Sequence, residues 1–435
     1  MIKRNSRFIL LLLGLFFRIA ISFYTYSGDV TNHMIWGETA VKNGLQGLYD
    51  IDFYKYYGHI SPNYPPITIL FFAFLYLVKV WVYQFAWFLN LHLPFFPSKL
   101  IFFLKDFDYY PYLLKLPAIL SDIGIAYVSY LFAKKIVGKK KSAWPVITSS
   151  LVLFNPAYFY NSAYWGQIDS IPLFFLLTSF YYLLYHKKFL TSAILITLGL
   201  LSKQTVIIFI PLFLLILSTK VSLKRLIIIC LISLTFFWVF FLPFYQQGHL
   251  LIFPFLTFWN KILLVSGLPF TSNHAFNFWY LLTGSRTTLA SSKFILDISY
   301  DIWGYLIAGT VTFLVLLKLI KNKFKSRDIL YVGFLIPFIT FLFLTKMHER
   351  HLILVLPFLL LASHNNKFLL ISFFYLSLFN FLNLYHSWWA PPIFILQQLF
   401  SSPFITKSAT VLLLIFFIVI SINYFGVSLF TLKKK

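Results

Sequence analysis

Long apolar runs separated by short polar segments make up most of the chain, and strand-like alternation is absent. A transmembrane helix needs about 20 mainly apolar residues, and helices remain the only option when a barrel pattern is missing. The pattern therefore predicts an all-α fold, a polytopic transmembrane helical bundle of about 13–14 helices. The candidate spans are 8–24, 66–82, 84–104, 112–133, 143–160, 170–185, 189–202, 204–219, 224–244, 302–320, 328–345, 351–364, 367–385 and 408–430.

The stretch 66–104 is assigned two spans because of the loops on either side of it. Basic span ends must alternate with acidic or neutral loops, and they do so only if this stretch crosses the membrane twice. The two crossings would meet in a very tight turn near Tyr83. Two longer segments, 25–65 and 245–301, lie outside the spans, and we expect them to carry functional residues.

The composition agrees with a membrane protein. The 435 residues are 60% hydrophobic and only 11% charged, with a mean hydropathy of +0.82, whereas soluble chains average about 25% charged residues. This excludes a cytosolic enzyme and a disordered chain. The single cysteine, Cys230, excludes an intramolecular disulfide and any multi-cysteine metal site.

The net charge of +24 suggests nucleic-acid binding at first, but the basic residues occur in blocks between the spans. The positive-inside rule places such blocks in the cytoplasm. The excess is therefore an orientation signal for a multi-pass protein of the cell membrane, surrounded by membrane lipids, and we expect no nucleic-acid partner. The blocks are 3–7, 134–141, 187–188, 220–225, 318–327, 367 and 433–435.

All acidic residues except Asp328 lie outside these blocks. An ionisable group at a membrane is costly, so each is a functional candidate. Asp29 follows the first predicted helix by a few residues, and the string WGQID supplies Gln167 and Asp169 at a membrane boundary. A solvated loop carboxylate is the alternative for Asp29, and a helix-capping role is the alternative for Asp169.

Two further strings carry cationic groups. LSKQT places Lys203 and Gln204 inside an apolar stretch, where an anionic ligand or a snorkelling lysine would satisfy the charge. TKMHERH places His348, Arg350 and His351 between two spans, and such donors suit a phosphate. Ion pairing with Glu349 is the alternative, and the three-residue histidine spacing differs from that of zinc protease helices.

The segment SNHAFNFWYLLTG, 272–284, places Asn277 among aromatic residues. Such a mixture can stack on sugar rings and hydrogen-bond hydroxyl groups, although an interfacial helix would have the same composition. Dinucleotide, Walker and G-x-S-x-G fingerprints are missing. A nucleotide-sugar donor therefore has no visible site.

The ordered set of motifs resembles the GT-C superfamily of membrane glycosyltransferases, especially GPI-type and related prokaryotic mannosyltransferases. The set comprises an aspartate just past the first helix, YPP before the second, WGQID, SKQ, AFNFW and HER. The resemblance covers 1–360, which would form the catalytic module, while 361–435 would hold C-terminal transmembrane helices. It implies inverting transfer of a hexose, such as mannose or glucose, from a polyprenyl-phosphate-sugar on the non-cytoplasmic face. The acceptor would be a glycan, a lipid or a protein.

By this resemblance Asp29 would act as the general base toward the acceptor hydroxyl. Asp169 would orient the acceptor or the donor sugar. Lys203, His348 and Arg350 would stabilise charge on the leaving phosphate.

The further substrate-binding candidates are Gln167, Gln204, His351 and Asn277. Some relatives pair acids in the first loop and use a divalent cation, but here the next acid after Asp29 is Glu38. We therefore expect no metal and no other cofactor.

Two alternatives to a glycosyltransferase of this kind remain open. A transporter or lipid flippase could use Lys115, Asp122 and Lys203 as a pathway, although the chain shows no matching pair of broken spans in its two halves. A ligase or polymerase with a polyprenyl-pyrophosphate donor would use related chemistry.

Overall fold

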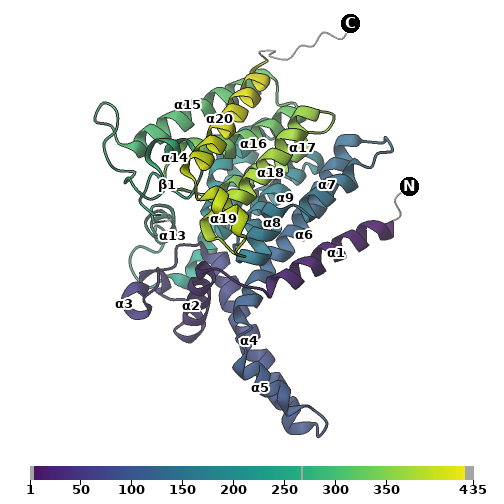
Figure 1. Cartoon of the computed structure of the whole chain (residues 1–435), viewed down its shortest axis with the longest axis vertical. Coiled ribbons are helices and arrows are strands. Elements are labelled where there is room, and N and C mark those ends of the chain that lie inside the picture. The colour runs from purple at the N-terminus through teal and green to yellow at the C-terminus, as the bar shows by residue number, and fades with distance from the viewer. Residues whose placement is uncertain (1–3, 266–267, 427–435) are drawn as a thin grey trace.

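The computed structural model describes residues 4–265 and 268–426, and within them the chain is almost entirely helical (Figure 1). The two strands, β1 (Ser272–Asn273) and β2 (Met347–His348), pair in parallel. The α-helices are α1 (Arg4–Ser22), α2 (Gly28–Lys42), α3 (Phe53–Tyr57), α4 (Pro66–His92), α5 (Ser98–Asp106), α6 (Tyr110–Val137), α7 (Trp144–Leu153), α8 (Pro156–Phe159), α9 (Ser170–Tyr181), α10 (Phe189–Ser202), α11 (Ile210–Ser218), α12 (Leu223–Phe241), α13 (Phe253–Thr257), α14 (Phe278–Thr283), α15 (Tyr300–Lys321), α16 (Ser326–Phe343), α17 (Leu356–Ala362), α18 (Lys367–Trp388), α19 (Phe394–Phe400) and α20 (Pro403–Phe425). Short 3₁₀ or π segments occupy Leu48–Asp50, Tyr160–Trp165, Tyr182–His186, Gln204–Phe209, Leu242–Phe244, Phe258–Leu263 and Glu349–Val355.

The prediction of an all-α polytopic bundle is confirmed. Within the described residues, seven helices are long and apolar enough to cross a membrane. The predicted span 8–24 corresponds to the 19-residue helix α1, which is not among the seven. Several other predicted spans correspond to shorter or broken helices, such as α7 followed by α8, or the Glu349–Val355 segment followed by α17. The seven are Pro66–His92, Tyr110–Val137, Leu223–Phe244, Tyr300–Lys321, Ser326–Phe343, Lys367–Trp388 and Pro403–Phe425.

The predicted pair of spans within 66–104 is wrong. Tyr83 lies inside the continuous helix α4, and the chain reverses only at 93–97, before the nine-residue helix α5. Pro94 and Pro97 flank this reversal, and proline removes the backbone donor that would continue a helix. Hydropathy alone places no boundary here because the stretch is apolar on both sides of Tyr83.

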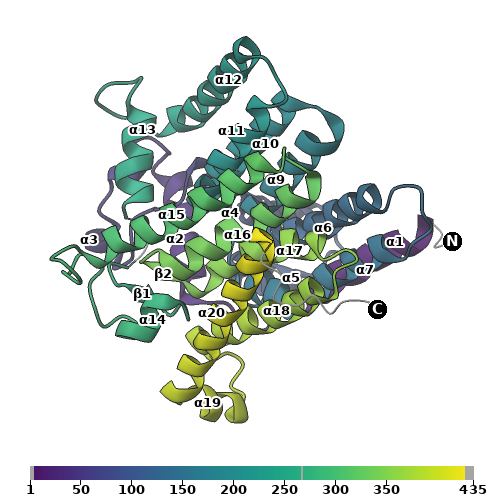
Figure 2. The ribbon, with the colours of Figure 1, turned by 90° about the horizontal axis from the view of Figure 1, so that it is seen from above.

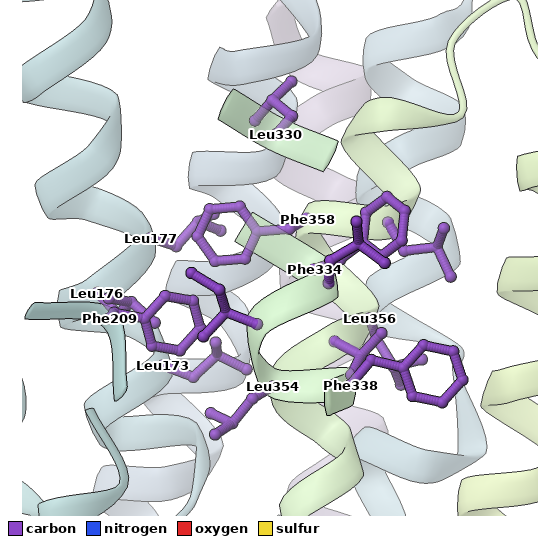
Figure 3. Packing of buried hydrophobic residues seen from close by; sticks show 14 of the residues in the cluster. Leu173, Leu176, Leu177, Phe209, Leu330, Phe334, Phe338, Leu354, Leu356 and Phe358 are labelled. Atoms are coloured by element: carbon purple, nitrogen blue, oxygen red, sulfur yellow. The ribbon is translucent and has the colours of Figure 1, made fainter. Parts of the chain in front are cut away.

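The main core lies where α9, α16, α17 and the Gln204–Phe209 segment meet (Figure 3). Phe358 from α17 packs edge-on against Phe180 and stacks on Phe209, with ring centroids 5.4 and 5.7 Å apart. The aromatic and branched side chains fill this region from all sides, as a densely packed interior requires. The core therefore holds α9, α16, α17 and the Gln204–Phe209 segment in fixed positions relative to one another.

The helix directions define two ends of the bundle. At the basic end, three lysine-rich turns connect consecutive elements. They join α6 to α7, the segment after α9 to α10, and α15 to α16. Figures 1 and 2 both show the α6–α7 turn on the same side of the molecule as the start of α1. At the opposite end, α9 begins at Ser170, α10 ends at Ser202 and α16 ends at Phe343. The strings WGQID, SKQ and HER all lie at this opposite end.

Two buried cations join α1 to the rest of the bundle. The Arg18 guanidinium forms an ion pair with Asp122 of α6 at 2.8 Å, and Ser162 and Ser170 also donate hydrogen bonds to that carboxylate. The Lys115 ammonium donates to the carbonyls of Ser22, Thr25, Ala163 and Tyr164. Asp122 and Lys115 therefore have structural partners, which disfavours their use as a transport pathway.

The C-terminal helices share the core with the helices before 360. Asn155 donates to Ser377 of α18 at 2.8 Å, and Tyr280 of α14 hydrogen-bonds Thr406 of α20. Asn383 of α18 accepts from the Phe276 amide and donates to the His274 carbonyl. α18 thus positions the loop around β1.

Candidate active site

Helix α2 places Asp29 at its N-terminal end, one residue after Gly28. The Ser27 amide donates to the Trp165 carbonyl at 3.1 Å, which anchors this end of α2 beside the WGQID string. Further along, Gly37 allows close contact, because a Cβ there would overlap the Tyr110 hydroxyl and the Phe72 backbone. The close packing of α2 on α4 and α6 therefore depends on this glycine.

Gln167 lies against Asp29 and donates a 2.5 Å hydrogen bond from Nε2 to the carboxylate Oδ2. The preceding Gly166 has a φ of +91°, in the left-handed region that favours glycine. A Cβ at Gly166 would also approach the Val30 side chain to 2.5 Å. The turn that presents Gln167 to Asp29 thus requires glycine on two grounds.

Arg350 approaches the same carboxylate oxygen of Asp29 as Gln167 does. Its Nη1 is 3.7 Å from Asp29 Oδ2 and 3.3 Å from Glu349 Oε1. Glu349 is buried, whereas 38% of the Asp29 side chain is exposed. Oδ2 of Asp29 is therefore near both an amide donor and a guanidinium, while part of the side chain stays accessible.

Lys203 has Asp169 as a buried partner, with Nζ 2.6 Å from Oδ1. Asp169 precedes α9 but makes no side-chain capping bond, so the capping alternative does not describe it. The Lys203 ammonium also lies 5.4 Å from the centroid of the Tyr64 ring, within cation–π range. Lys203 thus has no acidic neighbour along its own helix but finds one at the start of α9.

His33 and Tyr64 belong to the same cluster. Tyr64 is the tyrosine of the YPP string, but neither residue was predicted to be part of the site. His33 follows Asp29 by one helical turn, and its ring lies 5.4 Å from Tyr64 and stacks on Phe72 at 4.5 Å. The Tyr64 backbone is fixed by a hydrogen bond from Tyr49. The i, i+4 spacing from Asp29 is the signal that sequence reasoning could have used. We define the Asp29 cluster as Asp29, His33, Tyr64, Gln167, Asp169, Lys203 and Arg350.

The charge states follow from burial and from neighbouring charges. Burial raises the pKa of Asp29, but Arg350 and the hydrogen bond from Gln167 outweigh it and hold that pKa below its usual value. Burial lowers the pKa of His33 to about 3 and raises that of Glu349. At neutral pH the site therefore presents an ionised Asp29 beside an uncharged imidazole.

Several buried polar atoms of the cluster and its neighbours make no hydrogen bond within the described part of the chain. Gln167 Oε1, Glu349 Oε2 and His33 Nδ1 lack a partner, as does the donor Arg350 Nε. Buried polar groups are nearly always satisfied, so such atoms call for an explanation. A ligand with hydroxyl groups and an anionic oxygen would satisfy both the acceptors and the donor.

The remaining predicted residues are arranged as follows. Gln204 is buried next to Lys203, and its Oε1 is also without a partner among the described residues. Burial lowers the pKa of His348 well below its usual value, so its ring is uncharged at neutral pH. It can donate and accept hydrogen bonds but supplies no positive charge. His351 Nδ1 accepts from the His348 amide, which leaves its other ring nitrogen as the donor when it is neutral.

Asn277 has a structural position. Its side chain caps α14 by accepting from the Tyr280 amide, and it donates to the Phe341 carbonyl of α16 at 3.1 Å. The structure gives no contact between Asn277 and the Asp29 cluster.

In residues 4–265 and 268–426 no group of three or more His, Cys, Asp and Glu side chains is arranged to hold a metal ion. Neither the models of known protein families nor the curated proteins give a match to this chain.

Proposed function

We propose that the protein is an integral membrane glycosyltransferase that transfers a hexose from a polyprenyl-phosphate-sugar to an acceptor on the non-cytoplasmic face. The observation that carries the proposal is the ionised, partly exposed Asp29 carboxylate, held by Gln167 and Arg350 at the end of the bundle opposite the basic turns. Because basic turns mark the cytoplasmic side, that end faces outward. Mannose and glucose are the sugars we expect.

The proposed reaction needs one proton acceptor. Asp29 removes the proton from the acceptor hydroxyl, whose oxygen forms a new bond to the anomeric carbon. The bond between that carbon and the donor phosphate oxygen breaks, and its electron pair stays on the phosphate. A carboxylate with a low pKa is a weak base, so its contribution depends on removing the proton as the new bond forms.

The leaving phosphate needs preorganised donors. Arg350 suits this role because its Nε is buried and has no protein partner in the described residues. Gln167 Oε1 and Glu349 Oε2 are buried acceptors without a partner in the described residues, so sugar hydroxyls that reached them would complete their hydrogen bonding. Lys203 is already paired with Asp169, so we expect it to contribute to the positive potential of the site and not to bind the phosphate directly.

The experiment is a transfer assay with purified protein, a candidate acceptor mixture and polyprenyl-phosphate-mannose or polyprenyl-phosphate-glucose. We expect free polyprenyl phosphate to be released by the wild type. We expect Asp29→Asn to reduce release by about 10²–10⁴-fold, the usual contribution of a general base, while thermal stability stays close to wild type. Glu38→Gln, a matched change on the same helix outside the cluster, should keep full activity.

The assay also separates the alternatives. Movement of a lipid-linked sugar across the membrane without release of polyprenyl phosphate would indicate a flippase or transporter. Use of a polyprenyl-pyrophosphate donor would indicate a ligase or polymerase. Near-normal release by Asp29→Asn would remove Asp29 as the base.

A further inference from the structure

The second half of α4 and all of α5 leave the body of the molecule (Figure 1). α4 is buried at its start, where Pro66–Ile69, Phe72 and Ala73 pack against α2 and α10. Beyond Lys79 it runs free to the reversal at 93–97, and α5 then leads back to α6. We define the arm as residues 80–106.

A set of polar contacts fixes the base of the arm to the start of α6. Lys79 Nζ is 2.9 Å from Asp108 Oδ1, and the Tyr109 hydroxyl donates to the Lys79 carbonyl at 2.6 Å. At the far end, Asn90 Nδ2 donates to Ser98 Oγ and closes the hairpin. The chain therefore leaves the bundle after Lys79 and rejoins it before Asp108 at the same level, where α6 begins.

The arm is too short to cross a bilayer and return. The 13 residues of α4 after Lys79 extend about 20 Å, and the nine residues of α5 extend about 14 Å. The hydrocarbon core of a bilayer is about 30 Å thick. Helix α4 as a whole is long and apolar enough to be a span. The arm, which consists of its second half and α5, is too short to form two crossings.

Most of the exposed residues of the arm are apolar, and the exposed polar ones are Gln84, His92, Ser98, Lys99, Lys105 and Asp106. Phe95 is 82% exposed, and Trp81, Phe85, Phe88, Leu91 and Phe102 are also exposed. An exposed apolar surface of this kind marks a site of contact with lipid or with another protein. No other described part of the chain covers these side chains.

The direction and composition of the arm indicate lipid as its surroundings. In Figure 1 α1 and α6 run toward the upper right, whereas the arm points to the lower right and so leaves the bundle sideways. Trp81, Tyr83 and Trp87 are of the types that concentrate at membrane interfaces. Lys99 and Lys105 have long side chains whose amines can reach phosphate head groups while their methylene groups stay in apolar surroundings.

We propose that the arm lies in one leaflet of the bilayer without crossing it, and that phospholipid acyl chains cover its apolar faces. This assignment depends only on the membrane location of the bundle and not on the proposed function.

The test uses the single cysteine of the chain. In a Cys230→Ser background, Phe95→Cys is labelled with an environment-sensitive fluorophore and reconstituted in phosphatidylcholine vesicles. We expect a blue-shifted emission that is quenched by lipids with a nitroxide on the acyl chain. The matched control is Tyr54→Cys on α3, which is 78% exposed and should show neither effect.

Two results would overturn the proposal. Quenching only by a water-soluble reagent in pure lipid vesicles would place the arm in water, where only a protein partner could cover it. Labelling of Phe95→Cys by an impermeant maleimide from the cytoplasmic side would show that the arm crosses the membrane. If Phe95→Cys is not monodisperse, Phe102→Cys on α5 provides the same measurement.

Discussion

At the scale of single residues, the environment of Asp29 predicts how transfer depends on pH. A general base must be deprotonated, so the rate rises with pH through the pKa of the base. Arg350 and Gln167 hold the pKa of Asp29 below 3.8, and burial lowers the pKa of His33 to about 3. We therefore expect kcat/KM for the donor to stay constant between about pH 5 and 8 and to fall only in stronger acid.

The measurement is the initial rate of polyprenyl phosphate release across this range. Each sample is then returned to neutral pH, so that loss of folding is separated from titration. An acidic limb near pH 6.5, the usual value for histidine, would contradict the charge states described for the site.

Arg350 carries a second prediction at this scale. Arg350→Lys keeps the positive charge but loses the planar guanidinium and its free Nε donor. A hydrogen bond to a charged group contributes about 1.5–3 kcal/mol, so we expect kcat/KM for the donor to fall about 10–100-fold. Lys42→Met, which removes an exposed charge from α2, is the control and should have little effect. Unchanged donor kinetics in Arg350→Lys would contradict the phosphate assignment.

The sequence predicted the main residues of the cluster but not how their charges are paired. Asp29, Gln167, Asp169, Lys203 and Arg350 all lie in strings recognisable without a structure. Their pairing depends on which helix ends meet, because Lys203 ends one helix and Asp169 starts another. Sequence spacing carries no information about such contacts.

At the scale of elements, buried ionic groups determine how helices are joined. The buried Arg18–Asp122 pair and Lys115, with its four carbonyl acceptors, fasten α1 and the Tyr160–Trp165 segment to α6. Removing one member of a buried pair leaves an uncompensated charge. These contacts hold the end of α1 and the WGQID string in the positions that bring Gln167 to Asp29.

Helix boundaries were predicted well only where polar residues mark them. The span expected at 112–133 corresponds to α6, and the one at 302–320 to α15, because lysine-rich turns follow both. Inside 66–104 no charged turn exists, so the reversal was placed near Tyr83 only by the requirement that basic and acidic or neutral loops alternate, and α4 runs through that position. Pro94 and Pro97 were the local signal for the true reversal.

At the scale of the whole molecule, the basic blocks that the sequence assigns to the cytoplasm distinguish the two ends of the bundle. The lysine-rich turns gather at one end, and the carboxylates of the Asp29 cluster lie at the other. What the sequence does not reveal is that the C-terminal helices reach this second end. α18 contacts the loop around β1, and β1 pairs with β2, which carries His348 beside Arg350.

Two asparagines on α18 provide the test of this connection. Asn383 is buried and makes two hydrogen bonds, to the Phe276 amide and the His274 carbonyl. Asn380, one turn earlier, is equally buried, but neither of its amide atoms has a partner in the described residues. Removing Asn383 therefore leaves two backbone groups unsatisfied, whereas removing Asn380 leaves none.

We expect Asn383→Leu to lower the free energy of unfolding by about 2–4 kcal/mol, because each unsatisfied buried group costs about 1–3 kcal/mol. Asn380→Leu should be neutral or stabilising, since it replaces an unpartnered buried amide with an apolar side chain. The measurement is the thermal unfolding of both variants in the same detergent. Equal destabilisation of the two would indicate that side-chain volume, and not the bonds from α18, determines the packing of the loop. A loss confined to Asn383→Leu would show that the hydrogen bonds from α18 stabilise the loop around β1.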